Sequence, residues 1–207
     1  MLPFKTPFVA KYIYPRLLWK VKTTEKVIYL TFDDGPIPNL TEWVLDVLKE
    51  YDAKATFFCV GENVLRNRSI YNRVLAEGHS VGNHTQHHIN GKRSKAEVYL
   101  ADVLACDEAL DTDKSNSSLF RPPYGRLTNA QRKALLKDKT IVMWDVLTQD
   151  YDQTIDPSII LRKSIAATSK GSIVVFHDNV KAEANLKAVL PAYLRHFEKA
   201  GYRFEAL

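Results

Sequence analysis

The sequence predicts an α/β protein whose parallel sheet forms a (β/α) barrel, and three observations support this fold class. Seven strand-like runs alternate along the chain with segments of helical periodicity. Strands that alternate with helices pair in parallel, because each helix carries the chain back across the sheet. Polar, chemically able residues follow the ends of most of these runs, and a barrel gathers such ends on one rim.

The expected elements follow one another without an internal repeat or a linker, so we expect one domain over residues 25–207. The expected strands are 27–32, 55–60, 79–83, 118–121, 140–146, 172–177 and 202–206. The expected helices are 40–51, 62–77, 94–112, 127–138, 156–169 and 182–200, with start signals at Asn39, Ser94, Thr128 and Asp156-Pro157. An open doubly wound sheet is the alternative, but its glycine-rich nucleotide loops are absent from the sequence. An open sheet would also place the polar residues at its strand ends along a wider line, whereas a barrel gathers them on one rim.

Composition excludes several other classes of protein. The 207 residues carry a net charge of +5 with no block of like charges, so nucleic acid is not an expected partner. Cys59 and Cys106 lie in apolar contexts without C-x-x-C spacing. We therefore expect reduced core thiols, and neither a disulfide framework nor a thiolate zinc site.

Residues 1–24 are expected to form an N-terminal arm packed on the domain. Their apolar and aromatic run is broken by Lys5, Lys11, Arg16 and Lys20, which suits neither a signal peptide nor a membrane-spanning helix. The packed arm is therefore preferred to a membrane anchor. The lack of a visible leader predicts a cytoplasmic protein. The sequence does not define the oligomeric state, and a monomer is the default expectation.

Two motifs at successive strand ends point to a metal site. Asp33 and Asp34 follow the first apolar run, and adjacent carboxylates raise each other's pKa unless a cation or hydrogen-bond donors intervene. His84 and His88, after the third strand, have the spacing that places two imidazoles on one side of a helical turn. One Asp with two His is a common ligand set for a catalytic zinc-type ion. His87 leaves open which neighbouring imidazole faces the metal.

Two further motifs supply groups for catalysis. Arg121 can pair with Asp33 and keep it ionised. The two prolines before Tyr124 make a rigid loop that can aim a main-chain N–H at an oxyanion. His177 follows a buried strand, and its pKa can be tuned to suit a general acid. The Asp pair and the histidine pair are each weak indications alone, whereas together at strand ends they are a much stronger one.

In this order and spacing, TFDDGP, HTxxH, RPPYG and the strand ending at His177 resemble the NodB-homology polysaccharide deacetylases, carbohydrate esterase family 4. The resemblance covers roughly residues 25–207. It implies a distorted, incomplete (β/α) barrel, TIM-like with about seven strands. It also implies metal-dependent hydrolysis of an N-acetyl group on an amino sugar of a glycan, such as peptidoglycan or a chitin-type polymer.

The resemblance also implies roles for the matching residues. Asp33 would be the general base, oriented by Arg121, and His177 the general acid. The Tyr124 main-chain N–H would help to bind the oxyanion. The divalent metal, expected to be Zn²⁺ with Co²⁺ or Ni²⁺ also possible, would be held by Asp34, His84 and His88.

One motif departs from the family pattern. The family's D-x-x-D-W supports the general acid and lines the pocket, and here Leu147 and Tyr151 replace its first Asp and its Trp. Asp150 matches and joins the expected catalytic set. Asp145, two residues before Leu147, is expected on the same side and could take over the missing tether to His177.

Three functions therefore stay open. They are deacetylation of a GlcNAc-containing glycan, the same chemistry on a small non-sugar amide, and glycan binding without turnover. The glycan itself is not identified by the sequence. Since many substrates of the family lie outside the cell, the expected compartment conflicts with the expected substrate.

Overall fold

The central element of the fold is a curled parallel sheet. The computed structural model describes residues 3–110 and 118–207. Neighbouring strands follow the order β5-β4-β3-β2-β1-β7-β6, and β8 pairs with the start of β1. Their bounds are β1 (Val27–Asp33), β2 (Ala55–Cys59), β3 (Ser80–Asn83), β4 (Leu119–Phe120), β5 (Thr140–Ile141), β6 (Val146–Leu147), β7 (Ile173–His177) and β8 (Arg203–Phe204). Because β5 and β6 end the path without pairing to each other, the expectation of an incomplete barrel is confirmed.

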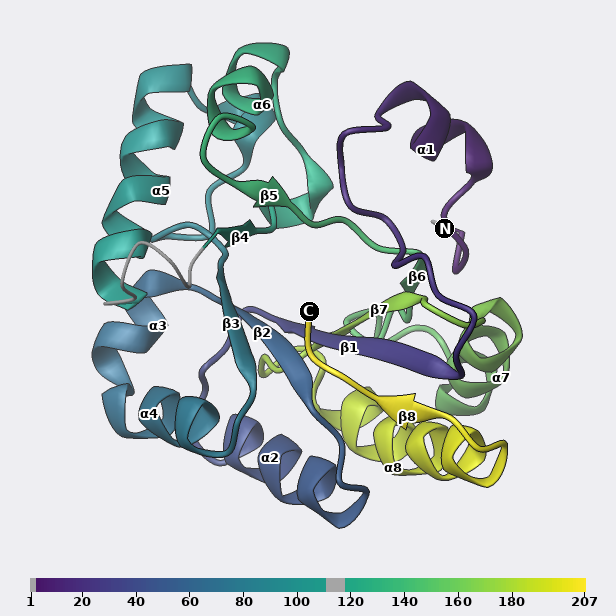
Figure 1. Ribbon diagram of the computed structural model, residues 1–207. Helices are drawn as coiled ribbons and strands as arrows, with labels where there is room; N and C mark the ends of the chain where they lie inside the picture. Colours follow the sequence, from purple (N-terminus) through teal and green to yellow (C-terminus); the bar gives the residue numbers. More distant parts are fainter. Residues whose placement is uncertain (1–2, 111–117) are drawn as a thin grey trace.

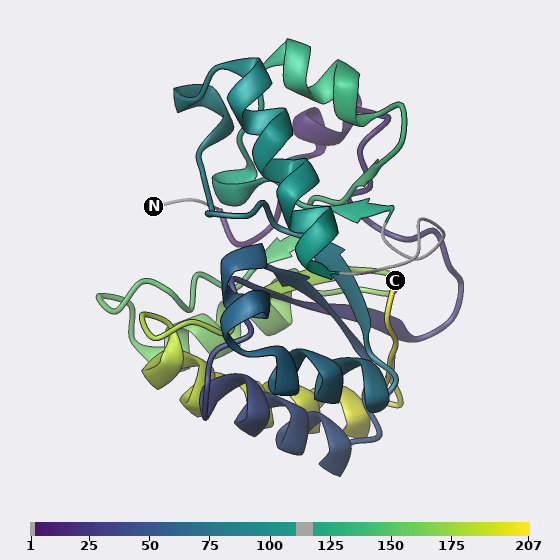
Figure 2. The same ribbon diagram turned by 90° about the vertical axis from the view of Figure 1, so that its left-hand side faces the viewer.

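Helices cover the outside of this sheet (Figures 1 and 2). Their bounds are α2 (Leu40–Glu50), α3 (Gly61–Arg66), α4 (Arg68–Ala76), α5 (Ala96–Leu110), α6 (Asn129–Leu135), α7 (Pro157–Ala167) and α8 (Glu183–Lys199), with short 3-10 turns η1 (Gly91–Arg93) and η2 (Pro123–Gly125). Three predicted start signals are confirmed. Asn39 and Thr128 form capping boxes, and the Asp156 side chain accepts the Ser158 N–H. The last two residues of the expected helix 94–112 lie outside the described part of the chain.

Side chains along β1 and β7 alternate between the outer face of the sheet, which packs in the hydrophobic core, and the inner face, which borders the candidate site. On β1, Phe32 points outward and stacks between Phe57 and Phe176, with ring centroids 5.1 and 6.0 Å away. Asp33 and His177 belong to the opposite register and reach the cavity at the carboxyl ends of the strands. Since side chains of a strand alternate between its faces, the apolar outer layer leaves the inward positions free for polar groups.

Two expected elements are each divided in the structure. The expected strand 140–146 is the two short strands β5 and β6, because the residues between them cross from one edge of the sheet to the other. The expected helix 62–77 is α3 and α4, with the break at Asn67. There φ is −126° and ψ is 46°, and the side-chain amide donates to the Pro36 carbonyl at 3.0 Å.

The N-terminal segment lies along the gap between β5 and β6. Near its start, Thr6 N donates to the Asp145 carbonyl at 2.9 Å. Later, Leu18 N donates to the Ile141 carbonyl at 2.9 Å, and Val21 N to the Gly171 carbonyl at 2.9 Å. Between these attachments the chain forms the short helix α1 (Phe8–Ile13), which buries no residue. None of the helices in the described ranges is long and apolar enough to cross a membrane.

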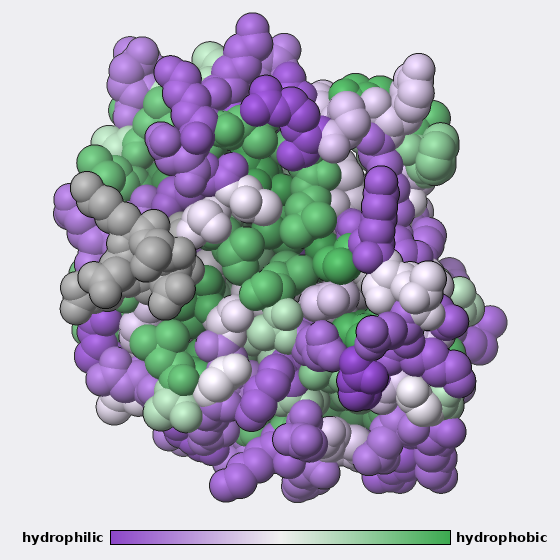
Figure 3. Space-filling view, viewed as in Figure 1, coloured by the Kyte–Doolittle hydropathy of each residue, from purple (hydrophilic) through white to green (hydrophobic). Residues whose placement is uncertain are grey.

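Hydrophobic side chains fill the centre of the barrel on the face drawn in Figure 3. The buried members are Phe58, Val142 and Ile173, and the partly buried Leu18 and Leu207 pack against them. Both cysteines are free and buried, as the sequence predicts, and burial raises the pKa of the Cys106 thiol to about 12. The opposite, polar end of the barrel carries the candidate site.

Candidate active site

The expected convergence of strand ends is present in the structure. Asp33 ends β1 directly beside His177 at the end of β7. The strand ends surround a cavity of about 780 Å³. Of the eight residues predicted for the site, Asp33, Asp34, His84, His88, Tyr124 and His177 line the cavity. Arg121 and Asp150 are fully buried behind it and contact members of that set.

Three side chains form a cluster that fits a metal ion. Asp34 Oδ1 lies 3.4 Å from His84 Nε2 and 3.1 Å from His88 Nε2. All three potential ligand atoms lie within 4.8 Å of one another. The Asp34 Oδ1 atom is buried without a hydrogen-bond partner, which is costly for a carboxylate oxygen. A cation bound between these atoms would satisfy that oxygen, so the residues fit a divalent metal.

Hydrogen bonds around the cluster prepare its ligands. His84 Nδ1 lies 2.7 Å from the Arg121 carbonyl. A carbonyl only accepts, so Nδ1 carries the proton and Nε2 keeps its lone pair for a metal. The Asn179 amide donates to Asp34 Oδ2, and the Asn63 amide donates to the Asp34 carbonyl at 2.7 Å. Burial raises the pKa of Asp34, but His84, His88 and the nearby His177 outweigh this effect and hold it well below its usual range.

The two histidines reach the cluster from a loop, so the expectation of a helical turn is wrong. Residues 84–88 have no helical hydrogen bonding. Instead, Thr85 and His88 take left-handed φ values of 66° and 53° and turn the chain back on itself. His87 points away, with Nδ1 2.6 Å from Asp102 Oδ1. His88, and not His87, therefore faces Asp34.

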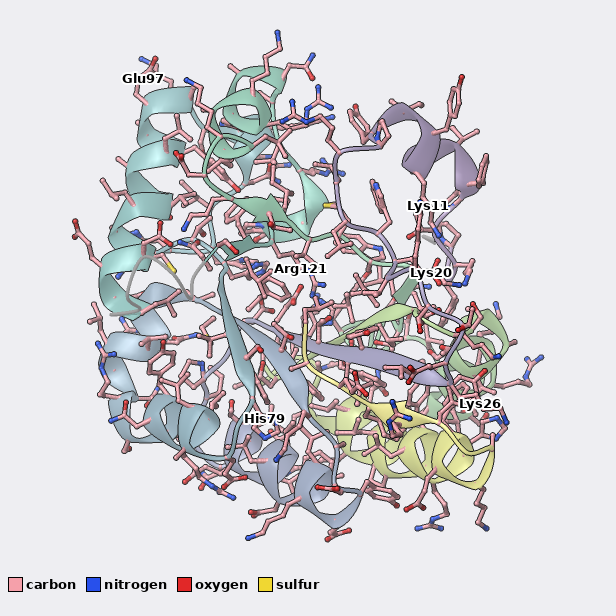
Figure 4. All side chains as sticks on the ribbon, in the orientation of Figure 1. Lys11, Lys20, Lys26, His79, Glu97 and Arg121 are labelled. Atoms are coloured by element: carbon pink, nitrogen blue, oxygen red, sulfur yellow. The ribbon has the colours of Figure 1, made fainter. Side chains whose placement is uncertain are left out.

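Asp33 is held by a buried arginine. Arg121 Nη1 donates to Asp33 Oδ1 at 2.6 Å and to the Thr31 hydroxyl at 2.7 Å. Nη2 donates to the Met143 carbonyl at 2.9 Å, and the guanidinium lies 4.1 Å from the centroid of the Phe58 ring. Figure 4 shows Arg121 in the interior of the barrel. The planar guanidinium of Arg121 thus fixes one oxygen of Asp33, and the other oxygen stays available for catalysis.

His177 is tied to Asp150. Asp150 Oδ1 lies 2.7 Å from His177 Nδ1, and Oδ2 accepts the His177 main-chain N–H at 2.8 Å. Burial lowers the pKa of His177, but Asp150 outweighs it, with smaller contributions from Asp34 and Asp33, and the pKa rises to about 9. His177 is therefore an imidazolium at neutral pH. With Nδ1 engaged, Nε2 is the nitrogen that can deliver a proton.

Asp145 has another role, and the expectation that it could tether His177 is wrong. It is fully buried and accepts hydrogen bonds from Lys5 and Ser172, both at 2.6 Å, and from Lys11. Burial raises its pKa, but these three donors outweigh it and lower the pKa. Asp145 therefore joins the N-terminal segment to the sheet.

Aromatic side chains form the walls of the cavity. The exposed Tyr124 has a left-handed φ of 59°, and its ring lies 4.8 Å from that of His88. Tyr151 packs edge-on against His177 at 5.0 Å. Trp144 and Leu147 also line the cavity. The ring that packs edge-on against the general-acid candidate is thus a tyrosine, and the position of the missing Asp is filled by the apolar Leu147.

No role was predicted from the sequence for two groups beside the cluster of Asp34, His84 and His88. Asn179 holds Asp34, although nothing in its sequence context marks an amide as a carboxylate partner. Asp178 is fully buried, and it accepts the Thr41 hydroxyl at 2.6 Å and the Gly35 N–H at 3.1 Å. Both lie within two residues of His177, but only the structure shows that they reach this cluster.

The comparisons with known proteins agree with this geometry. A family model described as polysaccharide deacetylase matches residues 20–142, more than half of the chain. The chain belongs to the polysaccharide deacetylase family. The resemblance stated from the motifs is thereby confirmed, as is the enzyme class, a polysaccharide deacetylase.

Two relatives and one solved structure show how far the likeness extends. A peptidoglycan-N-acetylglucosamine deacetylase of Bacillus cereus is 36% identical over 90% of this chain and 88% of its own length. The enzyme PgdA of Listeria monocytogenes, with the same activity in its name, is 36% identical over 87% of this chain but only 38% of its own length. The crystal structure of the Bc1960 peptidoglycan N-acetylglucosamine deacetylase with 4-naphthalen-1-yl-N-oxidanyl-benzamide has a TM-score of 0.86 and 28% identity, covering 98% of this chain and 95% of that one. Structural likeness therefore includes the N-terminal segment.

Proposed function

We propose that this polysaccharide deacetylase is a metal-dependent hydrolase that removes N-acetyl groups from GlcNAc-containing glycans, and that peptidoglycan is its substrate. One observation carries the proposal. Three groups border the same cavity: the potential metal ligands Asp34, His84 and His88, the carboxylate of Asp33 that Arg121 holds, and the protonated imidazole of His177. Hydrolysis of an amide needs these three elements, namely an activated water, a base and an acid for the leaving amine.

Asp34, His84 and His88 would hold the ion. One carboxylate oxygen and two imidazole nitrogens suit Zn²⁺, with Co²⁺ or Ni²⁺ also acceptable to such donors. When bound, the ion would polarise the acetamide carbonyl and lower the pKa of a water molecule. Asn179 and the Arg121 carbonyl would orient the ligands, since each holds one of them through the atom that does not face the cluster.

The chain's own residues would move the protons. Asp33, fixed through Oδ1, would use its other oxygen to take a proton from the attacking water. The Tyr124 main-chain N–H would donate to the oxygen that gains charge in the tetrahedral intermediate. His177 Nε2–H would protonate the departing nitrogen as the C–N bond breaks. One water and one N-acetyl group thus give acetate and a free amine.

Peptidoglycan is preferred to a chitin-type polymer for two reasons. Both named relatives are peptidoglycan-N-acetylglucosamine deacetylases. In addition, the charged residues that line the cavity outside the proposed catalytic set are all cations, and all three are exposed: Arg93, Arg126 and Lys181. Cations at the mouth favour a glycan that carries carboxylates, as peptidoglycan does, over a neutral one.

The test is acetate release from peptidoglycan fragments and from chitin oligomers by the metal-loaded chain. We expect release from peptidoglycan that disappears after chelation, returns with added metal, and is lost in Asp33→Asn. The matched control is Asp46→Asn, which alters an acid on α2 paired with Arg73 at the surface. If the metal binds tightly but no glycan releases acetate, the proposal fails, and a small amide or a binding role replaces it.

A further inference from the structure

The helix α1 exposes an apolar stripe. Phe8, Val9, Tyr12 and Ile13 lie on one face, because residues four apart in a helix are neighbours, and their side chains are 58–79% exposed. Of the eleven large hydrophobic residues exposed in the described part of the chain, these four and Tyr14 lie within seven consecutive positions. Figure 3 shows hydrophobic surface over α1 at the upper right. Such clustering marks an interaction surface.

The charge of the molecule is concentrated on the same segment. Residues 1–24 contain five Lys and Arg and no acid, while the whole chain has 29 basic and 24 acidic residues, so 25–207 has 24 of each. Three of these lysines surround the single carboxylate of Asp145. Arg16 and Lys22 are exposed, and on α6 the Arg132 guanidinium lies 4.7 Å from the Tyr14 ring. The N-terminal segment that carries the apolar stripe therefore also carries the whole net charge of +5.

The stripe is held in place from both ends. Thr6 is bonded to the sheet before α1, and Leu18 after it, so the helix stands out between two fixed points. Figures 1 and 2 agree in placing α1 outside the barrel, at the same end as α6. In Figure 4, Lys11 and Lys20 lie beneath it on the side next to β6. A helix already ordered in this way loses little conformational entropy on binding a partner.

We propose that α1 docks onto the surface of an anionic lipid bilayer. Exposed Phe and aliphatic side chains would enter the boundary between headgroups and acyl chains, and the flanking cations would meet the lipid phosphates. Tyr12 and Tyr14 have an apolar ring and a polar tip, which suits that boundary. The inference goes beyond the deacetylase reaction, because none of these residues lines the cavity.

A second copy of this chain is the competing occupant, and the charge distribution disfavours it. In a symmetric dimer the same surface faces itself, so two segments that each carry all of the net charge would be brought together. An anionic lipid bilayer instead offers negative charge to the cations of the segment and an apolar interior to the stripe.

The experiment measures binding of the full, metal-loaded chain to vesicles. Sedimentation with phosphatidylcholine vesicles is compared with sedimentation with vesicles that also contain a quarter phosphatidylglycerol. One variant pair is Phe8→Ser with Tyr12→Ser, and the other is Arg16→Glu with Lys22→Glu. The matched control is Val98→Ser with Leu104→Ser, which changes side chains on α5 that are 57% and 59% exposed. Circular dichroism melting checks that every variant folds.

We expect at least about tenfold tighter binding to the anionic vesicles, since two or more cations contribute near the surface. Each variant pair in the N-terminal segment should lose about tenfold or more of that affinity, and the control on α5 should lose none. A Phe8→Trp reporter should shift its fluorescence to the blue on anionic vesicles. Acetate release from soluble fragments should persist in every variant, which separates this inference from the proposed function.

Three results would overturn it. The first is equal binding to neutral and anionic vesicles, and the second is wild-type binding by both variant pairs in the N-terminal segment. The third is a dimer, detected by light scattering, that is lost in Phe8→Ser with Tyr12→Ser while vesicle binding is absent. The last result would assign the stripe to a second copy of the chain.

Discussion

Replacing Asp150 with Asn should move the alkaline limit of activity. Asp150 accepts the His177 Nδ1–H at 2.7 Å and is the main reason that the pKa of His177 stands near 9 despite burial. The amide keeps the shape but not the charge. Burial alone lowers the pKa of an imidazole, so in the variant His177 should lose its proton near or below the ordinary value of 6.5.

The size of the effect follows from the same pKa. A rise from 6.5 to about 9 corresponds to about 3 kcal/mol of net stabilisation of protonated His177, after the cost of burial and with Asp150 as the main contributor, at 1.36 kcal/mol for each pKa unit. Because the pKa is raised in the folded state, this stabilisation is fully present below about pH 6.5. It is lost as the pH rises through about 9. The free energy of unfolding of the unmodified chain should fall over that window, and Asp150→Asn should abolish the slope.

Two assays test this prediction on metal-loaded protein. The pH profile of kcat/KM for acetate release gives the alkaline limb, and urea unfolding between pH 6 and 10 gives the slope. Asp145→Asn is the matched control. It changes another buried carboxylate, which binds Lys5 and Ser172 and does not contact His177. If the alkaline limb of Asp150→Asn stays near pH 9, the assignment of Asp150 as the partner that sets the His177 pKa is refuted.

Three other substitutions give separate outcomes. Arg121→Met should lower the free energy of unfolding by about 3–5 kcal/mol in urea titrations, because it leaves the buried carboxylate of Asp33 unpaired, and a loss below about 1 kcal/mol would contradict that. Asn179→Ala should weaken metal binding by about 10–100-fold in calorimetric titrations, since Asp34 loses its outer hydrogen bond, and unchanged affinity would show that this bond is unimportant. Asp145 has a lowered pKa, so its stabilisation is present above the ordinary value of 3.8 and lost as the pH falls. Asp145→Asn should flatten the acid side of the stability profile, and a steeper acid limb would count against the contacts described.

The sequence was sufficient for the fold class and for six of the side chains that border the cavity. Asp33, His84 and His177 come directly at or after buried strands, and in a parallel barrel that position alone brings residues distant in sequence together. The inferred partnership of Arg121 with Asp33 was also correct, because a buried arginine needs a carboxylate within reach.

The errors have a common physical origin in backbone that is neither helical nor extended. The spacing of His84 and His88 suggested a helical turn, but two left-handed residues bring the imidazoles together instead. Asp145 was placed beside Leu147 by the alternation of an extended strand. Trp144 and Leu147 both line the cavity, however, so the period of two is broken between them.

Long-range pairing was likewise hidden from the sequence. The asparagine that holds Asp34 lies 145 residues away from it, and no periodicity records such a hydrogen bond. The N-terminal segment was expected to pack on the domain. Its route along the gap between β5 and β6, however, is set by main-chain hydrogen bonds. Every residue has main-chain groups, so the sequence does not show which of them pair. Only the three-dimensional structure could show which of these groups meet.

The N-terminal segment along the gap between β5 and β6 also has a consequence for the order of assembly. Thr6 leaves the ribosome before its main-chain partner at Asp145, which is made 139 residues later, so these contacts have a high sequence separation. Elements joined by local crossovers can form before such contacts are possible, and this join is expected to close last. The helix α1 on this segment buries no residue, and weakly packed terminal segments tend to open first. The same segment carries α1, so local opening would release the helix from the barrel while the strands that position Asp34, His84 and His88 stay folded.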